Sequence, residues 1–316
     1  TNLSVFDLTD LPRRMAFIGA GPIGCELAQA FARFGSEVTL YERTRVLPRE
    51  DEDAAEVVER SLRRDGVSIV CGADVGKVEA TPAGKAIVAV CGGEESRVEV
   101  DEIFVGTGRA PNVDGLGLDA AGIEHGPDGV RVNDRLRTTN KRVYAAGDIA
   151  LKHKFTHAAD AAARLVIRNA LFFGRGKVSS LIIPWSTYTD PELARVGMSE
   201  AEAKAAGIEF DVYRRELKDV DRAIADGEEE GFVKVLTRKG SDKIMGAAIV
   251  SSHAGDMISE VTLAMDKGIG LGGIASVIHP YPTRAEAIRQ VGDLYMRTKL
   301  TPRVKGMFEW FLGMRR

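Results

Sequence analysis

Short apolar runs and amphipathic stretches alternate along the first hundred residues. The run at residues 15–19 (MAFIG) predicts a buried strand, and apolar positions within residues 22–34 recur with helical spacing up to Gly35. The later elements expected here are a strand at 37–42, a charged helix at 51–65, a strand at 67–70, two β-rich stretches within 74–100 and a buried strand at 102–108. This β-α-β order predicts a parallel sheet with helices on both of its faces.

The second half of the chain has a different order of elements. A strand-like segment at 143–148 (VYAAGD) precedes a long helix at 157–173, and Ser199 with Glu202 predicts a capping box at the start of a short helix. The remaining expected elements are a β-rich segment at 182–197, strands at 209–216, 231–237 and 244–250, and helices at 255–267 and 284–296. This mixed order predicts an α+β domain with an antiparallel sheet, separated from the first domain between Gly174 and Pro184.

Composition and charge narrow the class of protein. A net charge of −3 argues against a nucleic-acid-binding protein, which normally carries a basic face. No apolar run is long enough to span a bilayer and no signal peptide is visible, so we expect a cytoplasmic protein. Cys25, Cys71 and Cys91 form no CxxC pair, and we expect three buried thiols in a reducing compartment and no metal site.

A glycine-rich turn, Gly19-Ala20-Gly21-Pro22-Ile23-Gly24, joins the first predicted strand to the first predicted helix. Gly19 permits the tight turn, Gly21 leaves room for a pyrophosphate against the backbone, and Gly24 lets the helix pack on the strand. The helix N-terminus then offers free N–H groups and a positive dipole end to the phosphates. The motif predicts a dinucleotide site, the alternative being a strand–helix turn with no ligand.

An acidic residue is expected at the end of the second strand, where it accepts hydrogen bonds from the adenosine ribose. Glu42 lies at this place and would repel a 2′-phosphate, which favours NAD over NADP. Arg43 and Arg45 lie close enough in the sequence to bind such a phosphate, so NADP stays open as an alternative.

Five further segments, in a fixed order along nearly the whole chain, resemble the pyridine nucleotide-disulfide oxidoreductases, the family of dihydrolipoamide dehydrogenase, glutathione reductase and mercuric reductase. These segments are GPIGCELAQAFARFGSEVTL at 21–40, VGTGRAPN at 105–112, TTNKRVYAAGDIA at 138–150, PWSTYTDPELARVGMSEAEA at 184–203 and HPYPTRAEAI at 279–288. The resemblance implies a flavoprotein that passes a hydride from a nicotinamide nucleotide to FAD and on to a redox disulfide.

The resemblance also implies roles for individual residues. Gly108 corresponds to the glycine beside the bound nicotinamide nucleotide, and Glu26 to the glutamate that faces the nicotinamide. Asp148 corresponds to the aspartate that binds the ribityl chain of the flavin, with Thr156 and His157 beside the flavin. The alternatives are a solvated helix residue for Glu26, a turn aspartate for Asp148 and a helix N-terminal residue without ligand contact for His157.

The segment HPYPTRAE departs from the dihydrolipoamide dehydrogenase pattern. The family's acid/base histidine is replaced by Tyr281, as in mercuric reductase, and a tyrosine mostly donates a hydrogen bond at neutral pH. Pro280 and Pro282 favour extended geometry before them, so His279 and Tyr281 are expected to share a face. His279 then either substitutes in part for the missing histidine or merely packs.

Two interpretations apply to Glu286. The family's glutamate in this place orients the catalytic residue, whereas Thr283 followed by Glu286 also reads as a capping box. With tyrosine at position 281, the sequence favours the capping box.

The resemblance further implies that the FAD-binding turn and the CxxxxC pair lie upstream of Thr1. The expected domains are a linker from that half at 1–12, an NAD(P)-binding Rossmann-like α/β domain at 13–112, the C-terminal part of the FAD domain at 113–176 and an α+β dimerisation domain at 177–316. We therefore expect a parent homodimer that acts on a small disulfide or a metal ion, with this chain alone inactive.

Other functions stay open at this stage. The chain could be a non-catalytic NAD-binding dimeric module, or a relative of the monooxygenases or ferredoxin reductases. The tail GMFEWFLGMRR lacks the cysteine pair with which mercuric reductases hand over the metal. Its mixture of aromatic and basic residues suits docking on the partner subunit better than a membrane surface.

Overall fold

The computed structural model describes residues 1–82 and 84–315. These residues form two compact units, one made of 1–107 together with 186–316, the other of 108–185. Unit 1 is therefore discontinuous in sequence, and unit 2 is inserted within it.

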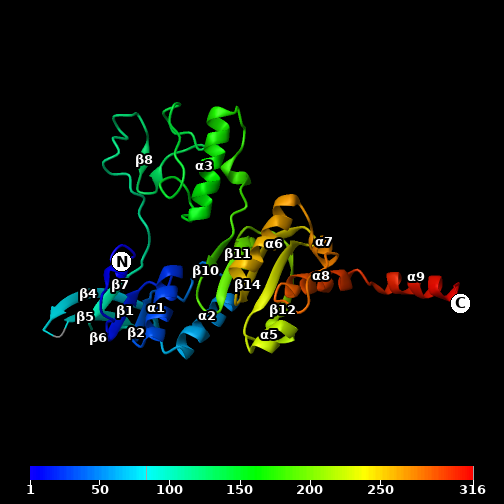
Figure 1. Cartoon of the computed structure of the whole chain (residues 1–316), viewed down its shortest axis with the longest axis horizontal. Helices are drawn as coiled ribbons and strands as arrows, with labels where there is room; N and C mark the ends of the chain where they lie inside the picture. Colours follow the sequence, from blue (N-terminus) through cyan, green and yellow to red (C-terminus); the bar gives the residue numbers. More distant parts are fainter. Residues whose placement is uncertain (83, 316) are drawn as a thin grey trace. The chain divides into compact units, whose positions relative to one another are not determined.

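A four-stranded parallel sheet forms the first half of unit 1 (Figure 1). Its strands lie in the order β3 (Ser68–Cys71), β2 (Glu37–Glu42), β1 (Arg14–Ile18) and β7 (Glu102–Val105), and the connecting helices are α1 (Pro22–Phe34) and α2 (Glu52–Arg64). This arrangement confirms the parallel sheet predicted from the β-α-β order.

The two faces of this sheet are covered differently from the expectation. Helices α1 and α2 pack together on one face, in a core that includes Phe17, Leu40 and Val58. The opposite face, which carries Ala16 and Tyr41, packs against an antiparallel sheet of β4 (Ala73–Thr81), β5 (Gly84–Cys91) and β6 (Glu94–Val100). The prediction of helices on both faces was wrong, because the β-rich stretches form a meander whose apolar side chains bury that second face.

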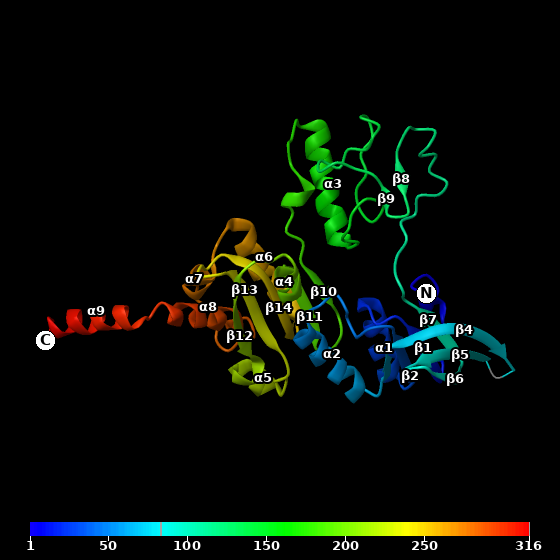
Figure 2. The same ribbon diagram turned by 180° about the vertical axis from the view of Figure 1, so that it is seen from behind.

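The second half of unit 1 is built on a five-stranded sheet (Figure 2). Its strands lie in the order β10 (Trp185–Thr187), β11 (Glu192–Gly197), β14 (Ile244–Ser251), β13 (Phe232–Arg238) and β12 (Phe210–Glu216). The ladders from β11 to β12 are antiparallel, as expected. Helix α6 (Ala254–Lys267) packs on β11 and β14, and α8 (Glu286–Thr298) packs on β12 and β13.

Helix α4 (Glu200–Ala205) begins with the predicted capping box, in which Ser199 and Glu202 each accept a backbone N–H of the other. The sequence interpretation did not include the short helices α5 (Asp221–Asp226) and α7 (Leu271–Ala275), the terminal helix α9 (Pro302–Gly313), or the 3-10 turns at Val5–Asp7 and Leu217–Asp219.

A buried lysine connects the two halves of unit 1. The side chain of Lys234 on β13 is 1% exposed, and its ammonium group lies 2.9 Å from Asp51, 2.8 Å from Asp53 and 2.9 Å from Glu200. Asp51 and Asp53 belong to the start of α2, and Glu200 opens α4. Burial alone would lower the pKa of Lys234, but the hydrogen bonds to the three carboxylates raise it, so this lysine stays charged.

Unit 2 contains helix α3 (Thr156–Leu171), a short hairpin of β8 (His125–Gly126) and β9 (Gly129–Val130), and a 3-10 turn at Val178–Ser180. Leu136, Leu151 and Leu165 lie in its core. The strand expected at 143–148 is not formed, because the described residues pair this segment only through an isolated bridge between Arg137 and Tyr144.

Candidate functional site

The glycine-rich turn lies between β1 and α1. Gly19 has a φ of +101°, and a Cβ there would lie 2.8 Å from the carbonyl oxygen of Gly106 on the neighbouring strand segment. A Cβ on Gly24 would collide with the carbonyl oxygen of Gly19, whereas a Cβ on Gly21 would meet nothing within 4 Å. Packing therefore requires two of the glycines, and Gly21 keeps the outer surface of the turn open.

Helix α1 begins directly after this opening. Gly21 is its N-cap, Pro22 lies at the first helical position, and the N–H of Cys25 reaches the carbonyl of Gly21 at 3.0 Å. The early N–H groups of a helix have no partner within the helix and favour anions. Pro22 and Ile23 thus belong to a surface that suits a pyrophosphate.

Glu42 ends strand β2 beside this turn. One carboxylate oxygen accepts the N–H of Ala20 at 2.9 Å, and the other accepts the N–H groups of Arg43 at 2.9 Å and Thr44 at 3.2 Å. Three backbone hydrogen bonds therefore hold the carboxylate of Glu42 beside the glycine turn.

The two neighbouring arginines are held by other groups. Two guanidinium nitrogens of the exposed Arg43 donate to one carboxylate oxygen of Asp74, at 3.1 and 2.7 Å. Arg45 donates to the backbone carbonyls of its own loop, among them Leu47 at 3.3 Å and Pro48 at 3.2 Å. Neither guanidinium is paired with the carboxylate of Glu42.

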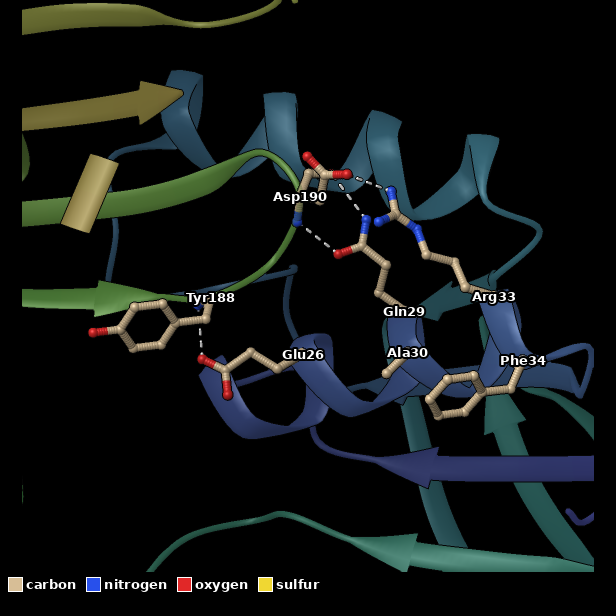
Figure 3. Close-up of a pocket in the computed structure, with 7 residues that line it drawn as sticks. All are labelled: Glu26, Gln29, Ala30, Arg33, Phe34, Tyr188 and Asp190. Atoms are coloured by element: carbon tan, nitrogen blue, oxygen red, sulfur yellow. Dashed lines mark hydrogen bonds and ion pairs between the residues drawn. The ribbon is translucent and has the colours of Figure 1, made fainter. Parts of the chain in front are cut away.

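A shallow pocket of about 260 Å³ lies along the exposed side of α1 and against the loop between β10 and β11 (Figure 3). The lining residues are Glu26, Gln29, Ala30, Arg33, Phe34, Tyr188 and Asp190. Glu26 accepts the backbone N–H of Tyr188 at 2.8 Å, so it is not the solvated helix residue that the sequence left as an alternative. Burial raises the pKa of the Glu26 carboxyl, and the N–H of Tyr188 offsets this only in part.

The same pocket contains residues that the sequence analysis missed. Gln29 pairs with the backbone of Asp190 through two hydrogen bonds, of 2.9 and 2.8 Å, and Arg33 lies 2.8 Å from the Asp190 carboxylate. The two bonds between Gln29 and Asp190 join positions 161 residues apart. The helical pattern of α1 gave no signal of them, because it describes only the face that packs on the sheet.

His279 and Tyr281 turn toward different helices, so the prediction that they share a face was wrong. His279 is 5% exposed in its side chain, with one ring nitrogen 2.8 Å from Glu260 on α6 and the other 3.1 Å from the carbonyl of Val277. Tyr281 is 70% exposed and donates its hydroxyl to Asp221 on α5 at 2.9 Å. The physical reason is that each ring finds a carboxylate on its own side of the loop.

The capping box predicted for Thr283 and Glu286 is not formed. Helix α8 begins only at Glu286 with Ala285 as its N-cap, and the hydroxyl of Thr283 donates instead to the carbonyl of Pro280. Glu286 accepts from Arg289 at 3.0 Å. The loop after Tyr281 continues two residues farther than a cap at Thr283 allows.

The candidate flavin residues lie in unit 2. Asp148 is half exposed and lies 3.3 Å from Arg109, while Thr156 and His157 open helix α3. His157 has its Nε2 2.7 Å from the carbonyl oxygen of Pro184, and its ring lies nearly parallel to that of Phe155. Gly108, with a φ of +145°, begins this unit.

Comparison with known proteins decides the family. The sequence profile described as pyridine nucleotide-disulphide oxidoreductase matches residues 2–164, and that of the corresponding dimerisation domain matches residues 183–291. The chain belongs to the pyridine nucleotide-disulphide oxidoreductase family. Its members use FAD and a nicotinamide nucleotide.

Curated relatives in this family include a mercuric reductase of Staphylococcus aureus, 35% identical over 92% of this chain and 53% of the relative. A dihydrolipoyl dehydrogenase of Thermus scotoductus is 33% identical over 90% of this chain and 62% of the relative. Among solved structures, the HOCl-induced flavoprotein disulfide reductase RclA of Escherichia coli has 28% identity and a TM-score of 0.84, covering 92% of this chain and 66% of that one. The chain thus spans about half the length of the mercuric reductases that it matches.

The described residues fit the two cofactors of the family unequally. The open surface at Gly21, next to the N-terminus of α1 and the carboxylate of Glu42, fits a dinucleotide. Unit 2 offers a half-exposed carboxylate at Asp148, which fits one polar contact to a flavin side chain. The described residues contain no group of three or more His, Cys, Asp or Glu side chains arranged to hold a metal ion.

The cysteines differ in part from the expectation of three buried thiols. Cys25 is buried, but Cys71 and Cys91 are partly exposed at the edge between the parallel sheet and the β4–β5 ladder. Burial raises the pKa of the Cys25 thiol strongly.

Proposed function

We propose that this chain supplies the nicotinamide-nucleotide and interface domains of an NADH-dependent flavoprotein oxidoreductase. The observation that carries the proposal is the glycine turn, in which packing requires Gly19 and Gly24 while Gly21 opens onto the N-terminus of α1. The family membership supports an oxidoreductase, and the relatives include reductases of mercuric ion and of disulfides.

The residues around the turn have distinct tasks in this proposal. The backbone N–H groups of Gly21 and Ile23 form the region that receives the pyrophosphate, and Pro22, which has no N–H, occupies the first helical position between them. Glu42 accepts from the adenosine ribose, and Gly108 lies beside the nucleotide. NADH, when bound, supplies the hydride, and Glu26 with the Tyr188 backbone borders the nicotinamide end along α1.

NAD is favoured over NADP by the charges at the end of β2. The carboxylate of Glu42 stands next to the place of the 2′ position and would repel a phosphate there. Arg43 is bound to Asp74 and Arg45 to loop carbonyls, so neither arginine is positioned to offset the negative charge of Glu42.

Tyr281 is proposed as the group of the interface domain that meets the substrate, in the partner subunit's active site of a homodimer. Its exposed hydroxyl and its hydrogen bond to Asp221 support this role. His279 is less suited, because both of its ring nitrogens already face oxygen atoms of this chain. The hydrogen bond to Asp221 raises the pKa of Tyr281, and the negative charge of Glu286 adds to this effect in a smaller, assisting role.

The flavin side of the proposal rests on unit 2. Asp148, Thr156 and His157 are proposed to border FAD, with Asp148 accepting hydrogen bonds from its ribityl hydroxyls. The substrate class is a small disulfide or a metal ion.

Titration calorimetry of the chain with NADH and with NADPH tests the proposal. We expect heat of binding with NADH, weaker binding of NADPH, and loss of both in a Gly21→Val variant, because its side chain fills the space of the pyrophosphate. Gly76→Val is the matched control, since Gly76 also faces open space with an ordinary φ but lies on β4, away from the turn.

Two results would contradict it. Folded wild-type chain that releases no heat with either nucleotide removes the assignment. Equal loss of binding in the Gly21 and Gly76 variants would show that the turn is not the binding site.

A further inference from the structure

The terminal helix α9 carries an apolar face that the described chain leaves uncovered. The helix spans 12 residues from Pro302 to Gly313 and has no buried residue. Large side chains are strongly exposed, among them Trp310 at 65% and Leu312 at 60%. Figures 1 and 2 draw α9 as the continuation of the chain beyond α8.

The apolar residues follow helical spacing. Val304, Met307, Phe308 and Phe311 recur at the i, i+3, i+4 and i+7 positions, and Trp310, Leu312 and Met314 widen the same face. Lys305 and Glu309 lie on the opposite side, one turn apart, at a nitrogen–oxygen distance of 4.0 Å. A helix with one apolar and one polar side is stable only when another surface covers its apolar side and excludes water from it.

The polar interactions of α9 among the described residues are internal. Thr301 accepts the N–H of Val304 at 3.4 Å as the N-cap, and the guanidinium of Arg315 lies 4.9 Å from the centre of the Phe311 ring. Among the described residues, no neighbouring element shields the aromatic side chains of this helix.

The charge of this region differs from that of the rest of the chain. Residues 297–316 contain six basic residues and one acidic residue, Glu309, within a chain whose net charge is −3. Basic residues lie near both ends of the helix, Arg303 and Lys305 in its first turn and Arg315 just after its last residue.

We propose that α9 lies in the plane of an anionic lipid bilayer surface, with its apolar face among the acyl chains and its basic residues at the headgroups. Tryptophan and phenylalanine next to lysine and arginine are typical of interfacial helices. A 12-residue helix is about 18 Å long, too short to cross a hydrocarbon core of about 30 Å. No helix among the described residues has the length and apolar character of a membrane span.

A second copy of the chain is the competing occupant of this face. Pairing two α9 helices would bring their basic flanks together, whereas an anionic bilayer is complementary in charge to all of them. The charge pattern therefore favours the bilayer over self-association.

Sedimentation of the whole chain with vesicles tests this proposal. Vesicles of phosphatidylcholine with phosphatidylglycerol are compared with vesicles of phosphatidylcholine alone. We expect binding to the anionic vesicles that weakens with salt, and a fall of roughly 30-fold in the Arg303→Gln/Lys305→Gln variant, since each basic residue near such a surface contributes about fivefold. Lys141→Gln/Arg142→Gln, which removes two exposed charges from unit 2, is the matched control and should bind as the wild type does.

Removal of the aromatic anchors gives a second, independent result. Trp310→Ser/Phe311→Ser should abolish vesicle binding at every salt concentration, because the apolar insertion is lost while the charge is kept. NADH binding of the same preparations reports folding, so failure here is distinguishable from failure of the proposed function.

Three outcomes overturn the proposal. They are the absence of binding to anionic vesicles, equal binding of the wild type and the Trp310/Phe311 variant, and a lipid-free dimer that becomes a monomer when residues 302–316 are removed. The last outcome would assign the apolar face to a second copy of the chain.

Discussion

Glu26 is a carboxyl group held where its charge is unfavourable. It lies on α1 at the edge of the pocket of Figure 3, next to the loop backbone of Tyr188. A single N–H donor does not replace the water that burial removes, and this is why the pKa of Glu26 rises.

A Glu26→Gln variant tests this effect. Because the folded-state pKa is raised, the folded wild type holds the proton more tightly than the unfolded chain. Its free energy of unfolding therefore falls as the pH rises from about 4.5 through the folded-state pKa. Glutamine keeps the acceptor for Tyr188 and has no charge, so we expect the variant to be more stable than the wild type above this range.

Urea unfolding followed by circular dichroism between pH 4 and pH 8 measures the difference. Glu56→Gln, at an exposed position of α2, controls for the loss of one negative charge. A stability difference between wild type and Glu26→Gln that does not change with pH would refute the explanation.

Tyr281 offers a second titration. The hydrogen bond to Asp221 raises the pKa of its hydroxyl, and the negative charges of Asp221 and Glu286 act in the same direction. Asp221→Asn should therefore lower that pKa toward 10, because both the carboxylate acceptor and its charge are removed. Ultraviolet titration at 295 nm, with Tyr281→Phe subtracted to isolate the one phenol, measures the change, and an unchanged or higher pKa would show that Asp221 does not hold the tyrosine.

Residues within one loop or one turn were predictable from the sequence. Gly19, Gly21, Gly24 and Glu42 lie where the strand–turn–helix pattern puts them, because their spacing is set by local backbone geometry. The partners of Glu26, His279 and Tyr281 were not predictable, since each is brought by another element and leaves no periodic signal in the sequence.

Among the elements, the largest departure concerns the second face of the parallel sheet. The sequence predicted β-rich stretches at 74–100 and helices on both faces, and only the first of these holds. Alternation within β5 buries Ile87 and Ala89 toward Tyr41, and this set of side chains closes the face that a helix would otherwise cover. The sequence pattern predicts the type of each element, because that type depends on neighbouring residues. Which element covers a face of the sheet depends on tertiary contacts, and the pattern does not reveal these.

The start of α8 shows the same limit on a smaller scale. Thr283 and Glu286 have the spacing of a capping box, yet the hydroxyl of Thr283 is used within the turn that follows Pro280. Ser199 and Glu202 have the same spacing and do form the box. A capping pattern is thus informative only where no other acceptor competes for the hydroxyl.

Lys234 on β13 forms ion pairs with carboxylates of both α2 and α4, and it thereby joins these three elements. Replacing this lysine by methionine removes the cation that Asp51, Asp53 and Glu200 share, although Asp53 keeps its contact with Arg214 and Glu200 its contact with Lys204. We expect the free energy of unfolding to fall by about 3 kcal/mol, at the lower end for a broken buried pair because Asp53 and Glu200 are partly exposed.

Chemical denaturation at pH 7 measures the Lys234→Met effect. Lys239→Met removes an exposed lysine that lies 2.8 Å from Asp211 and should cost less than about 1 kcal/mol. Losses of equal size in the two variants would show that burial of the Lys234 cluster adds nothing to its strength.

At the scale of the whole molecule, unit 1 consists of two sequence segments and unit 2 of the residues between them. The glycine-rich turn and Glu42 belong to the first segment of unit 1, and Tyr281 and α9 belong to the second. The sequence indicated an α/β region followed by an α+β region, which the two sheets of unit 1 confirm. It gave no sign that these regions form one compact unit while the residues between them form another, because that grouping is made by contacts such as those of Lys234.

The bond between Lys234 and Asp53 joins positions 181 residues apart. A ribosome adding 5–20 residues per second needs roughly 10–35 s to travel that distance. During this interval α2 has left the exit tunnel with its carboxylates still solvated by water, and β13 does not yet exist. Closure of unit 1 is thus a late event in biosynthesis, and its nascent first half has to persist without the Lys234 cation until translation supplies it.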